Sequence, residues 1–378
     1  MKQLCEVVII GAGIVGAATA FALTRAGNLR VALLEKGPLA GGMTRRSAGV
    51  AHPFQSHPRL IQYALESIAF YQNAAQHLGP SKNEFITTGA ALVGGNADAA
   101  KMFAQAQALA RFTQDASALA RGALAAQFPG VAPQLQAGLF TPHAGYADAA
   151  QMTQRLIQAA QTRGLTVATG AHVKQIQTVS GGARSVTTTM GSFEAPIVIV
   201  AAGGWSDKVL ASASQTVTLQ FQRGAVLFYE QPPEMTASHP IFWDVHGEFF
   251  LRPHPYRLSA AGWIAPPTPA LTLEPFDEFV APPAATRVSQ FMEQCLASKF
   301  VAPKRSHTIV YATGADGLPL MGRVHDAAGL FIAAGFGANT FAVAPAVGKI
   351  LAQLIVDGNA PPAASFFATP YAKEETLC

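Results

Sequence analysis

Residues 7–37 read VVIIGAGIVGAATAFALTRAGNLRVALLEKG. The pattern predicts a buried strand, a glycine turn, an amphipathic helix and a second strand that ends in an acid, which is typical of a dinucleotide-binding βαβ unit. Gly11 permits the tight turn, Gly13 lets the backbone approach a pyrophosphate, and Gly16 lets the helix lie close to the sheet. The helix start offers free N–H groups to phosphates, and the carboxylate of Glu35 can accept both hydroxyls of an adenosine ribose. The alternative, a glycine-rich turn in another kind of α/β protein, leaves Glu35 unexplained.

The composition indicates a compact enzyme. The chain has 378 residues, of which 50% are hydrophobic and 13% charged, so it is long enough for two domains with cores. The apolar residues are spread over alanines and short strands, and we expect no run of the roughly 18 residues that span a bilayer. The N-terminus leads directly into the first strand, which indicates no signal or transit segment. Three scattered cysteines predict neither a disulfide framework nor a metal site. The simplest interpretation is a cytoplasmic, reduced protein without a membrane span.

The net charge of +4 comes from dispersed basic residues, so it neither requires nor excludes a nucleic-acid partner. Along the chain, hydrophobic periodicity and glycine or proline positions predict further elements. We expect helices at 60–77, within 97–127 (one or two on the surface), at 145–164 and 284–298, strands at 85–93, 165–169 and 172–177, a buried strand with a glycine turn at 196–204, alternating strands at 216–263, a proline-rich bridge at 265–275, and a strand, turn and helix at 329–355.

Three units of a buried strand followed by a glycine turn are dispersed along the chain. Their strands begin near Val7, Ile197 and Phe331, and they can lie side by side in one parallel sheet. The aromatic-rich strands between them would form a separate layer. A domain assembled from such distant pieces is a more specific signal than any single motif.

Six segments, taken in order, carry a family resemblance. They are IIGAGIVG (9–16) with Glu35, SAGVAHP (47–53), GYADAAQM (145–152), IVIVAAGGWSDKVL (197–210), ADGLPLMG (315–322) and GLFIAAGFGANTF (329–341). In these the chain resembles the D-amino acid oxidase superfamily of FAD-dependent oxidoreductases, in particular its glycine oxidase and sarcosine oxidase branch. A second, narrower resemblance, through AGVAHPF, is to the FAD-dependent module of a bacterial enzyme that remodels a modified wobble uridine in tRNA.

The superfamily resemblance implies an α/β protein with two domains. A Rossmann-type FAD-binding domain would be built from the discontinuous segments 1–84, 145–215 and 309–378. A substrate domain with a mainly antiparallel sheet would comprise 85–144 and 216–308. Backbone N–H groups of residues 335–340 would face the pyrimidine edge of the flavin, where negative charge develops on reduction.

The same resemblance implies a set of cofactor-binding residues that share one cavity. They are Gly11, Gly13, Ile14, Val15, Gly16, Glu35, Lys36, Arg45, Arg46, Ser47, Ala48, Gly49, Val173, Ala201, Ala202, Gly203, Trp205, Gly335, Gly337, Ala338, Asn339 and Thr340. Arg45 and Arg46 would approach the pyrophosphate, although adjacent arginines more often form a solvated pair.

Two departures from the family bear on how the flavin is held. Branches that bind it covalently through a cysteine carry that cysteine just before the tyrosine matching Tyr311, where this chain has Ile309 and Val310. Other branches use a histidine just before the SAG element, where this chain has Arg46. The resemblance therefore implies noncovalent FAD.

Further departures bear on the substrate. Amino-acid oxidases of this type bind the substrate carboxylate with an arginine at the position of Tyr311, and glycine oxidases add an arginine near Ala338 and a tyrosine at Phe250. A bidentate arginine–carboxylate pair is a specific anchor, so its loss argues against a small amino acid held in the usual way. A lysine that promotes reaction with oxygen has no match near Ser259. The electron acceptor, O2 or another, therefore stays open.

Three residues are candidate catalytic groups, each with an alternative. His52 can orient the substrate or accept its ammonium proton, or it can be hydrogen-bonded to the loop backbone. Arg252 can replace the missing carboxylate anchor, or it can face outward from its strand. Tyr311 can place its hydroxyl over the flavin face, or its ring can pack in the core.

The resemblance implies FAD-dependent oxidation of the C–N bond of a small-molecule amine or amino acid. A hydride would pass to the flavin, the imine would be hydrolysed, and O2 or another acceptor would reoxidise the flavin. Three alternatives stay open. They are an enzyme acting on an aminomethyl group of a tRNA uridine, a flavin subunit of a hetero-oligomeric dehydrogenase, and a nicotinamide-dependent dehydrogenase, which has no use for residues 335–340.

Overall fold

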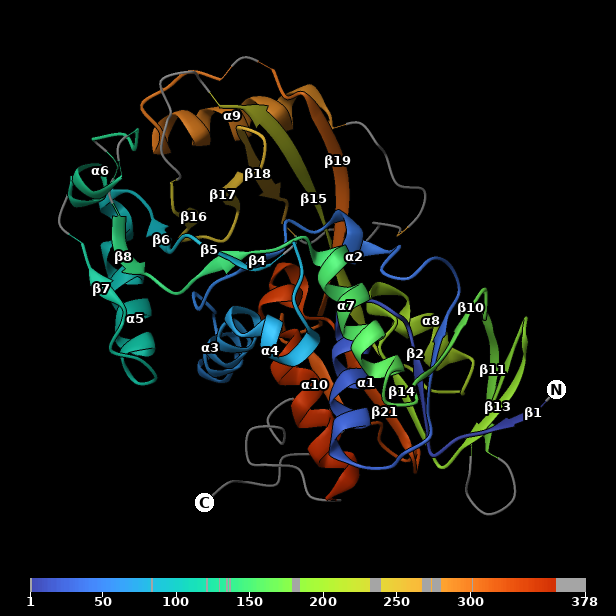
Figure 1. The fold of residues 1–378 in the computed structure, drawn as a ribbon. Helices are drawn as coiled ribbons and strands as arrows, with labels where there is room; N and C mark the ends of the chain where they lie inside the picture. Colours follow the sequence, from blue (N-terminus) through green and yellow to red (C-terminus); the bar gives the residue numbers. More distant parts are fainter. Residues whose placement is uncertain are drawn as a thin grey trace.

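The structure is a computed structural model, and it describes residues 2–82, 84–119, 122–128, 130–133, 135, 137–178, 184–231, 239–266, 273, 280–300 and 302–357. Most of the predicted bridge at 265–275, the residues after 357 and Cys378 lie outside the described residues. Two large sheets dominate the fold, one in each lobe of the ribbon in Figure 1. The chain crosses between the two lobes several times.

The first sheet is six-stranded, in the order β10-β3-β2-β14-β21-β20, and is parallel except for β20. Its strands are β2 (Val7–Ile10), β3 (Val31–Glu35), β10 (Thr166–Thr169), β14 (Ile197–Val200), β20 (Leu320–Arg323) and β21 (Leu330–Ala334). Strand β14 pairs with β2 on one side, Ile197 opposite Val7, and with β21 on the other, Ile199 opposite Phe331. The three dispersed strands therefore lie side by side, as the sequence predicts.

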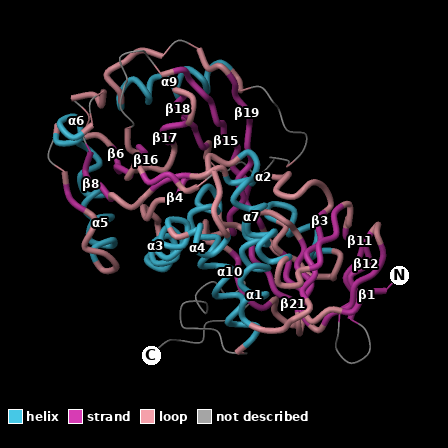
Figure 2. Tube along the Cα trace, viewed as in Figure 1, coloured by secondary structure: helices cyan, strands magenta, loops and turns pink. Residues whose placement is uncertain are grey.

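Both faces of this sheet are buried, which explains why its strands are apolar throughout. Side chains such as Ile9 and Leu33 pack against α1 (Ile14–Ala26), α7 (Ala149–Gln161) and α10 (Thr340–Val356). Figure 2 shows these helices gathered beside the strands. Side chains on the opposite face pack against a four-stranded sheet and α8 (Ser206–Ala211). The four strands are β1 (Lys2–Leu4), β11 (Val173–Thr178), β12 (Arg184–Thr188) and β13 (Gly191–Ala195).

The second sheet has the order β19-β15-β18-β17-β16-β6-β8-β7, and only its β16–β6 pair is parallel. The strands are β6 (Ala90–Val93), β7 (Ser117–Ala118), β8 (Ala137–Thr141), β15 (Leu219–Glu230), β16 (Ile241–Asp244), β17 (Phe249–His254), β18 (Leu258–Ile264) and β19 (Arg305–Gly314). One face packs against α9 (Pro282–Cys295), and the other faces the segment around Ala48 and Phe54. The mainly antiparallel second sheet agrees with the prediction.

Strand β19 runs to Gly314 in the second sheet, so the domain boundary expected at residue 309 lies within this strand, and the division into domains stays a prediction. One predicted element is wrong. The strand expected at 85–93 is two strands, β5 (Ile86–Thr87) and β6, in different sheets. Gly89 separates them with φ +72, in a place where a Cβ would lie 2.6 Å from the Phe140 ring. Strand β5 pairs instead with β9 (Gly145–Tyr146), next to β4 (Val50–Ala51).

The helix expected at 60–77 is interrupted at Asn73. Where one or two surface helices are expected within 97–127, the structure has two. The remaining short elements connect the sheets. They are α2 (Met43–Arg46), α3 (Pro58–Gln72), α4 (Ala74–Leu78), α5 (Ala99–Ala110), α6 (Ala123–Gln127) and the 3₁₀ turns η1 (Asn96–Asp98), η3 (Gly203–Trp205) and η4 (Gly337–Asn339).

The long helix α10 departs from one expectation. With its preceding turn it forms a stretch, Gly337–Val356, that is long and apolar enough to cross a bilayer by length and composition alone. However, 61% of that stretch is buried inside the structure, where α10 packs against α1 and α3. A core helix has these same properties.

Helix α10 contains Pro345, which has no N–H to donate to the carbonyl of Phe341 one turn earlier. The hydroxyl of Tyr71, on α3, donates to that carbonyl at 2.8 Å. The next N–H group, of Ala346, donates to the Ser67 hydroxyl of α3 at 3.2 Å. Helix α3 therefore supplies the hydrogen bonds that the proline removes from the start of α10.

We expect Tyr71→Phe to lower the free energy of unfolding by about 1–3 kcal/mol, because the buried Phe341 carbonyl loses its partner. Urea denaturation of the two proteins measures this difference. Tyr146→Phe is the matched control, since the Tyr146 hydroxyl forms no hydrogen bond with the described part of the chain. Equal losses in both variants would show that the Phe341 bond has no special role.

Candidate active site

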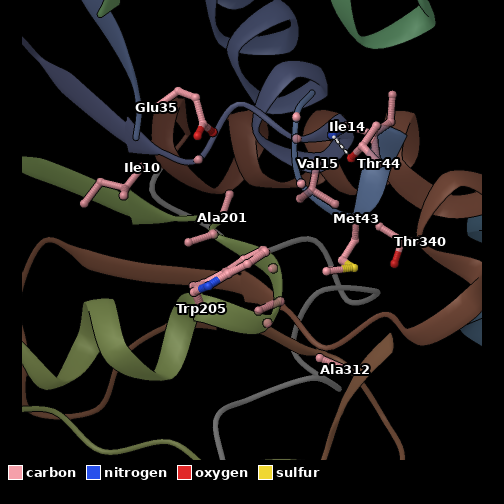
Figure 3. Close-up of a pocket in the computed structure, with 18 of the residues that line it drawn as sticks. Ile10, Ile14, Val15, Glu35, Met43, Thr44, Ala201, Trp205, Ala312 and Thr340 are labelled. Carbon is pink, nitrogen blue, oxygen red and sulfur yellow. Dashed lines mark hydrogen bonds between the residues drawn. The ribbon is translucent and has the colours of Figure 1, made fainter. Parts of the chain in front are cut away.

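A cavity of about 380 Å³ opens at the carboxyl ends of β2, β14 and β21. In open parallel sheets, ligands bind outside the carboxyl ends of the strands. The cavity extends from Glu35 and Trp205 at one end to Tyr311 and Gly337 at the other. Figure 3 shows Glu35, Trp205, Ala312 and Thr340, from segments far apart in the sequence, around this one space.

The glycine turn fits a phosphate-bearing ligand. Gly11 has φ +108, and a Cβ there would lie 2.5 Å from the Ala201 carbonyl oxygen, so this residue is closely packed against the end of β14. Gly13, Ile14 and Val15, at the start of α1, line the cavity. A helix start attracts anions, because its N–H groups lack helical partners and its dipole is positive there.

The hydroxyl of Thr44, on α2, accepts the N–H of Ile14 at 3.1 Å, the contact dashed in Figure 3. Thr44 and its neighbour Met43 both line the cavity, and neither is predicted from the sequence. The Met43 sulfur accepts the Val310 N–H at 3.4 Å, which ties α2 to β19. A short polar side chain in the glycine-bearing loop after β3 was the available signal for Thr44.

Glu35 ends β3 at one end of the cavity. Its Oε2 accepts the Ala12 N–H at 2.9 Å and its Oε1 accepts the Gly37 N–H at 2.8 Å. These bonds fix the carboxylate, and each oxygen keeps a lone pair for a further donor. Beside it, the Lys36 ammonium lies 4.1 Å from the centre of the Trp205 ring. This end therefore offers acceptors for ribose hydroxyls and a flat ring beside them.

The other end of the cavity is formed by η4, the first residue of α10 and β19. Gly335 and Gly337 have φ +77 and +60, conformations that favour glycine. The Thr340 hydroxyl donates to the Gly337 carbonyl at 2.7 Å, which closes the turn before α10. The described lining residues with acidic or basic side chains are Glu35, Lys36, His172 and Lys208. None of them comes from η4, β19 or the start of α10, so this end is apolar.

This lining fits FAD. The fit rests on the glycine turn that a Cβ would fill, on the N–H groups at the start of α1 that lack helical partners and on the fixed carboxylate at one end. The predicted cofactor residues that line the cavity are Gly11, Gly13, Ile14, Val15, Glu35, Lys36, Ser47, Val173, Ala201, Ala202, Gly203, Trp205, Gly335, Gly337, Ala338 and Thr340.

The other predicted cofactor residues do not line the cavity; they are Gly16, Arg45, Arg46, Ala48, Gly49 and Asn339. A Cβ on Gly16 would lie 1.9 Å from the Gly11 carbonyl oxygen, so Gly16 lets the helix pack closely against the glycine turn. Arg45 is exposed, and the Arg46 guanidinium donates to the Thr308 carbonyl at 3.1 Å. Gly49, with φ +64, lies against the Ala147 carbonyl.

His52 is buried, with 1% of its surface exposed, and does not line the cavity. Its Nδ1 accepts the Phe54 N–H at 3.1 Å, and its ring centre lies 4.1 Å from that of Trp243. Burial lowers the pKa of His52 to about 3, so the ring is neutral at pH 7. This geometry matches the alternative in which the histidine is hydrogen-bonded to the loop backbone.

Two buried histidines predict acid sensitivity. Burial lowers the folded-state pKa of His52 to about 3 and of His239 to about 4, while an unfolded histidine titrates near 6.5. The unfolded chain therefore binds more protons below pH 6.5, and stability is lost as the pH falls through that range. Each histidine accounts for about 2 kcal/mol at pH 5.

We expect His52→Asn to reduce the difference in unfolding free energy between pH 7.5 and pH 5.0 by about 2 kcal/mol. The asparagine oxygen can still accept the Phe54 N–H but does not titrate. Chemical denaturation at the two pH values measures the difference, and His239→Asn should give a similar reduction. An unchanged difference in both variants would contradict the expectation.

Arg252, on β17, is 5% exposed, so the alternative in which it faces outward is wrong. Its Nε donates to the Ala48 carbonyl at 2.7 Å, and its Nη1 donates to the Pro253 carbonyl at 2.7 Å. The guanidinium carbon lies 4.4 Å from the centre of the Tyr146 ring. Burial lowers the pKa of Arg252 to about 10. Arg252 does not line the cavity. It contacts Ala48, whose neighbour Ser47 lines the cavity.

Tyr311 lines the cavity from β19 and is 8% exposed. Its ring lies against Gly224 of β15, where a Cβ would be 2.7 Å from the ring. Burial raises the pKa of Tyr311, so its hydroxyl is protonated at pH 7. The packed ring matches the second alternative, and a hydroxyl placed over the flavin face stays a prediction.

The family model described as FAD dependent oxidoreductase, DAO, matches residues 6–354. Glycine oxidase of Geobacillus kaustophilus is 24% identical, over 94% of this chain and 94% of that protein. Dimethylglycine dehydrogenase of Rattus norvegicus is 24% identical over 95% of this chain but only 44% of that protein. The chain thus spans less than half the length of the mammalian relative.

Two solved structures have the same fold. The crystal structure of the Geobacillus kaustophilus glycine oxidase has a TM-score of 0.83 at 22% identity, and the match covers 98% of this chain and 100% of that chain. The L-proline dehydrogenase from P. horikoshii has a TM-score of 0.86 at 20% identity, with 97% of each chain covered. At these identities the similarity establishes the architecture, and the sites must be argued from this chain's own residues.

Proposed function

The chain belongs to the DAO family of FAD-dependent oxidoreductases, and on this basis we propose that it oxidises the C–N bond of an amine or amino acid. The observation that carries the proposal is the cavity itself. Its Glu35 end has the acceptors and N–H groups that FAD requires, and its Tyr311 end is apolar and faces the second sheet. The names of the matched glycine oxidase and dimethylglycine dehydrogenase refer to compounds in which an amine adjoins an oxidisable carbon.

Different residues along the cavity would hold different parts of FAD. Glu35 would hold the ribose, the start of α1 would hold the pyrophosphate, and the backbone around Gly337 would face the pyrimidine edge of the flavin. FAD, when bound, supplies the acceptor for the hydride that leaves the carbon next to the nitrogen, and O2 or another acceptor reoxidises it. Ile309 and Val310 in the wall have no side chain that could bond to the flavin, which supports a noncovalently held cofactor.

At the Tyr311 end the protein positions the substrate and excludes water. Ile309, Val310 and Ala338 form an apolar wall there, and Tyr311 keeps its proton at pH 7. Among the lining residues described at this end, no carboxylate or histidine can take the ammonium proton, so the substrate amine loses it to water before oxidation. Oxidation then leaves an imine, which water hydrolyses to a carbonyl compound and the released amine.

The visible spectrum of the purified protein tests the proposal. Under anaerobic conditions we would add D- and L-amino acids, N-methyl amino acids and simple amines in turn, with dithionite as the control that bleaches any accessible flavin. Bleaching by one of these compounds is the expected result and identifies the substrate class. A flavin that dithionite bleaches and the whole panel leaves oxidised would contradict the proposal. A tRNA substrate, a partner-dependent dehydrogenase and the cytoplasmic location remain predictions from the sequence.

A further inference from the structure

Three basic side chains form a row across the second sheet, from β17 past β18 and β15 to the start of β19. We call Arg252, His254 and Arg305 the basic cluster. The Nη1 of Arg252 lies 3.1 Å from Nδ1 of His254, and Nε2 of the same ring lies 3.2 Å from Nη2 of Arg305. Arg252 is buried, His254 is half-buried and Arg305 is exposed. The row therefore leads from the interior beside the cavity wall to the surface.

The basic cluster has more donors than acceptors. An arginine only donates, and a neutral imidazole has one acceptor nitrogen and one N–H group. Burial, with smaller effects from Arg252 and Arg305, lowers the pKa of His254 to about 4, so its ring is neutral at pH 7. The ring can accept from only one of the two arginines. At its other nitrogen, the ring N–H faces an N–H of the second arginine. The cluster lacks an acceptor.

No carboxylate in the described part of the chain forms an ion pair with any member of the basic cluster. Asp148 is the acid that acts electrostatically on Arg252 and His254. Its two oxygens instead accept from the backbone and side chain of Gln151, both at 2.9 Å, at the start of α7. Among the described residues, Arg252 therefore lacks the paired counter-charge that a buried guanidinium normally has.

The terminal Nη2 of Arg252 is available for such a counter-charge. Carbonyls of Ala48 and Pro253 satisfy Nε and Nη1, whereas Nη2 donates to none of the described residues. At the outer end, the guanidinium of Arg305 lies 4.0 Å from the centre of the Phe228 ring. The backbone carbonyls position the Arg252 guanidinium and the Phe228 ring positions that of Arg305, with the His254 ring between them.

We propose that the substrate of the oxidation carries an oxyanion, a carboxylate or a phosphate, that binds at the basic cluster and supplies the missing acceptor. Taking the ligand to be the substrate rests on the proposed function, whereas the anion site rests on the cluster alone. Arg305 precedes Ile309, which lines the cavity, by four residues of β19, or roughly 13 Å along a strand. The oxyanion is therefore remote from the amine.

A remote oxyanion agrees with the composition of the cavity wall. A small amino acid would need a cation beside its oxidisable carbon, and the Tyr311 end has none among its described lining residues. An amine with a distant carboxylate or phosphate places its apolar part against Ile309 and its charge at Arg252 and Arg305. The substrate would then be longer than the glycine or dimethylglycine in the names of the relatives.

Anion binding to the FAD-loaded protein tests the proposal without turnover. Inorganic phosphate and benzoate are titrated separately by calorimetry, so that the stronger ligand identifies the type of oxyanion. Arg305→Gln should raise the Kd of that anion at least tenfold. Lys304→Gln is the matched control, because it removes the same charge one residue away, and Lys304 is paired with Glu230 at 2.8 Å. It should change the Kd less than twofold.

Three results would overturn the proposal. The first is that neither anion binds the FAD-loaded protein at millimolar concentration. The second is that the two variants weaken anion binding equally, which indicates diffuse charge. The third is that tRNA binds in a salt-dependent manner while both small anions fail to bind, which indicates a nucleic-acid substrate. Calorimetry does not depend on flavin reduction. Anion binding with no bleaching by any amine would therefore contradict the proposed reaction and leave the anion site intact.

Discussion

Gly16→Ala is expected to weaken FAD binding strongly. The new Cβ would lie 1.9 Å from the Gly11 carbonyl oxygen and 3.1 Å from its carbon, both backbone atoms. Helix α1 cannot retreat, because a Cβ on Gly348 of α10 would be only 2.5 Å from the Ala18 backbone. The glycine turn itself must therefore shift. We expect the Kd for FAD to rise more than 100-fold, or about 3 kcal/mol, as for overpacking of a close contact.

Fluorescence titration of the apoprotein with FAD measures this change, and circular dichroism reports whether the variant folds. Gly27→Ala is the control, since Gly27 follows the same helix, has an extended φ of −179 and has nothing within 4 Å of its Cβ position. That variant should bind FAD as the parent does. If a folded Gly16→Ala protein also retains parental affinity, the turn does not hold the cofactor.

Glu35→Ala is expected to raise the Kd for FAD by about 100- to 1000-fold. The carboxylate orients two backbone segments through the N–H groups of Ala12 and Gly37, and under our proposal it also accepts the ribose hydroxyls. Hydrogen bonds to a charged group contribute about 1.5–3 kcal/mol each, so their combined loss accounts for this range. Glu35→Gln keeps one acceptor oxygen and should lose less.

FMN provides the discriminating measurement, because it lacks the adenosine that Glu35 would contact. The affinity for FAD should fall far more than the affinity for FMN in Glu35→Ala. Glu6→Ala serves as control: Glu6 also accepts a backbone N–H, from Arg30 at 2.6 Å, but at the exposed opposite end of the sheet. Equal losses for both flavins would show a general distortion of the cavity.

Residues 7–37 and the two later strand-and-glycine units were sufficient to predict the parallel sheet. A strand that is apolar on both faces belongs in a parallel sheet covered on both sides. The strands at Val7, Ile197 and Phe331 could therefore be placed in one sheet. The cofactor residues near these turns could be predicted for the same reason, since backbone N–H groups and missing Cβ atoms are local properties. Most of them line the cavity.

Features that depend on contacts between distant side chains could not be predicted. Thr44 reaches Ile14 across 30 residues, and its position in the glycine-bearing loop does not identify Ile14 as the partner. Gly89 separates β5 from β6 and lies against the distant Phe140 ring, a contact that the sequence does not show, so residues 85–93 read as one element. Arg252 lies in an apolar strand, but its burial and its row with His254 and Arg305 emerge only when β17 and β19 are placed together.

The strand order of the first sheet also constrains how the protein is made. Strand β2 leaves the ribosome early, yet its neighbour β14 begins at residue 197 and the next strand, β21, at residue 330. At synthesis rates of about 5–20 residues per second, the edge of β2 waits for tens of seconds without its partner. Such non-local pairing slows folding and exposes apolar strands to aggregation. The supply of FAD during expression should therefore affect the yield of folded protein, because the ligand can stabilise only a chain that is nearly complete.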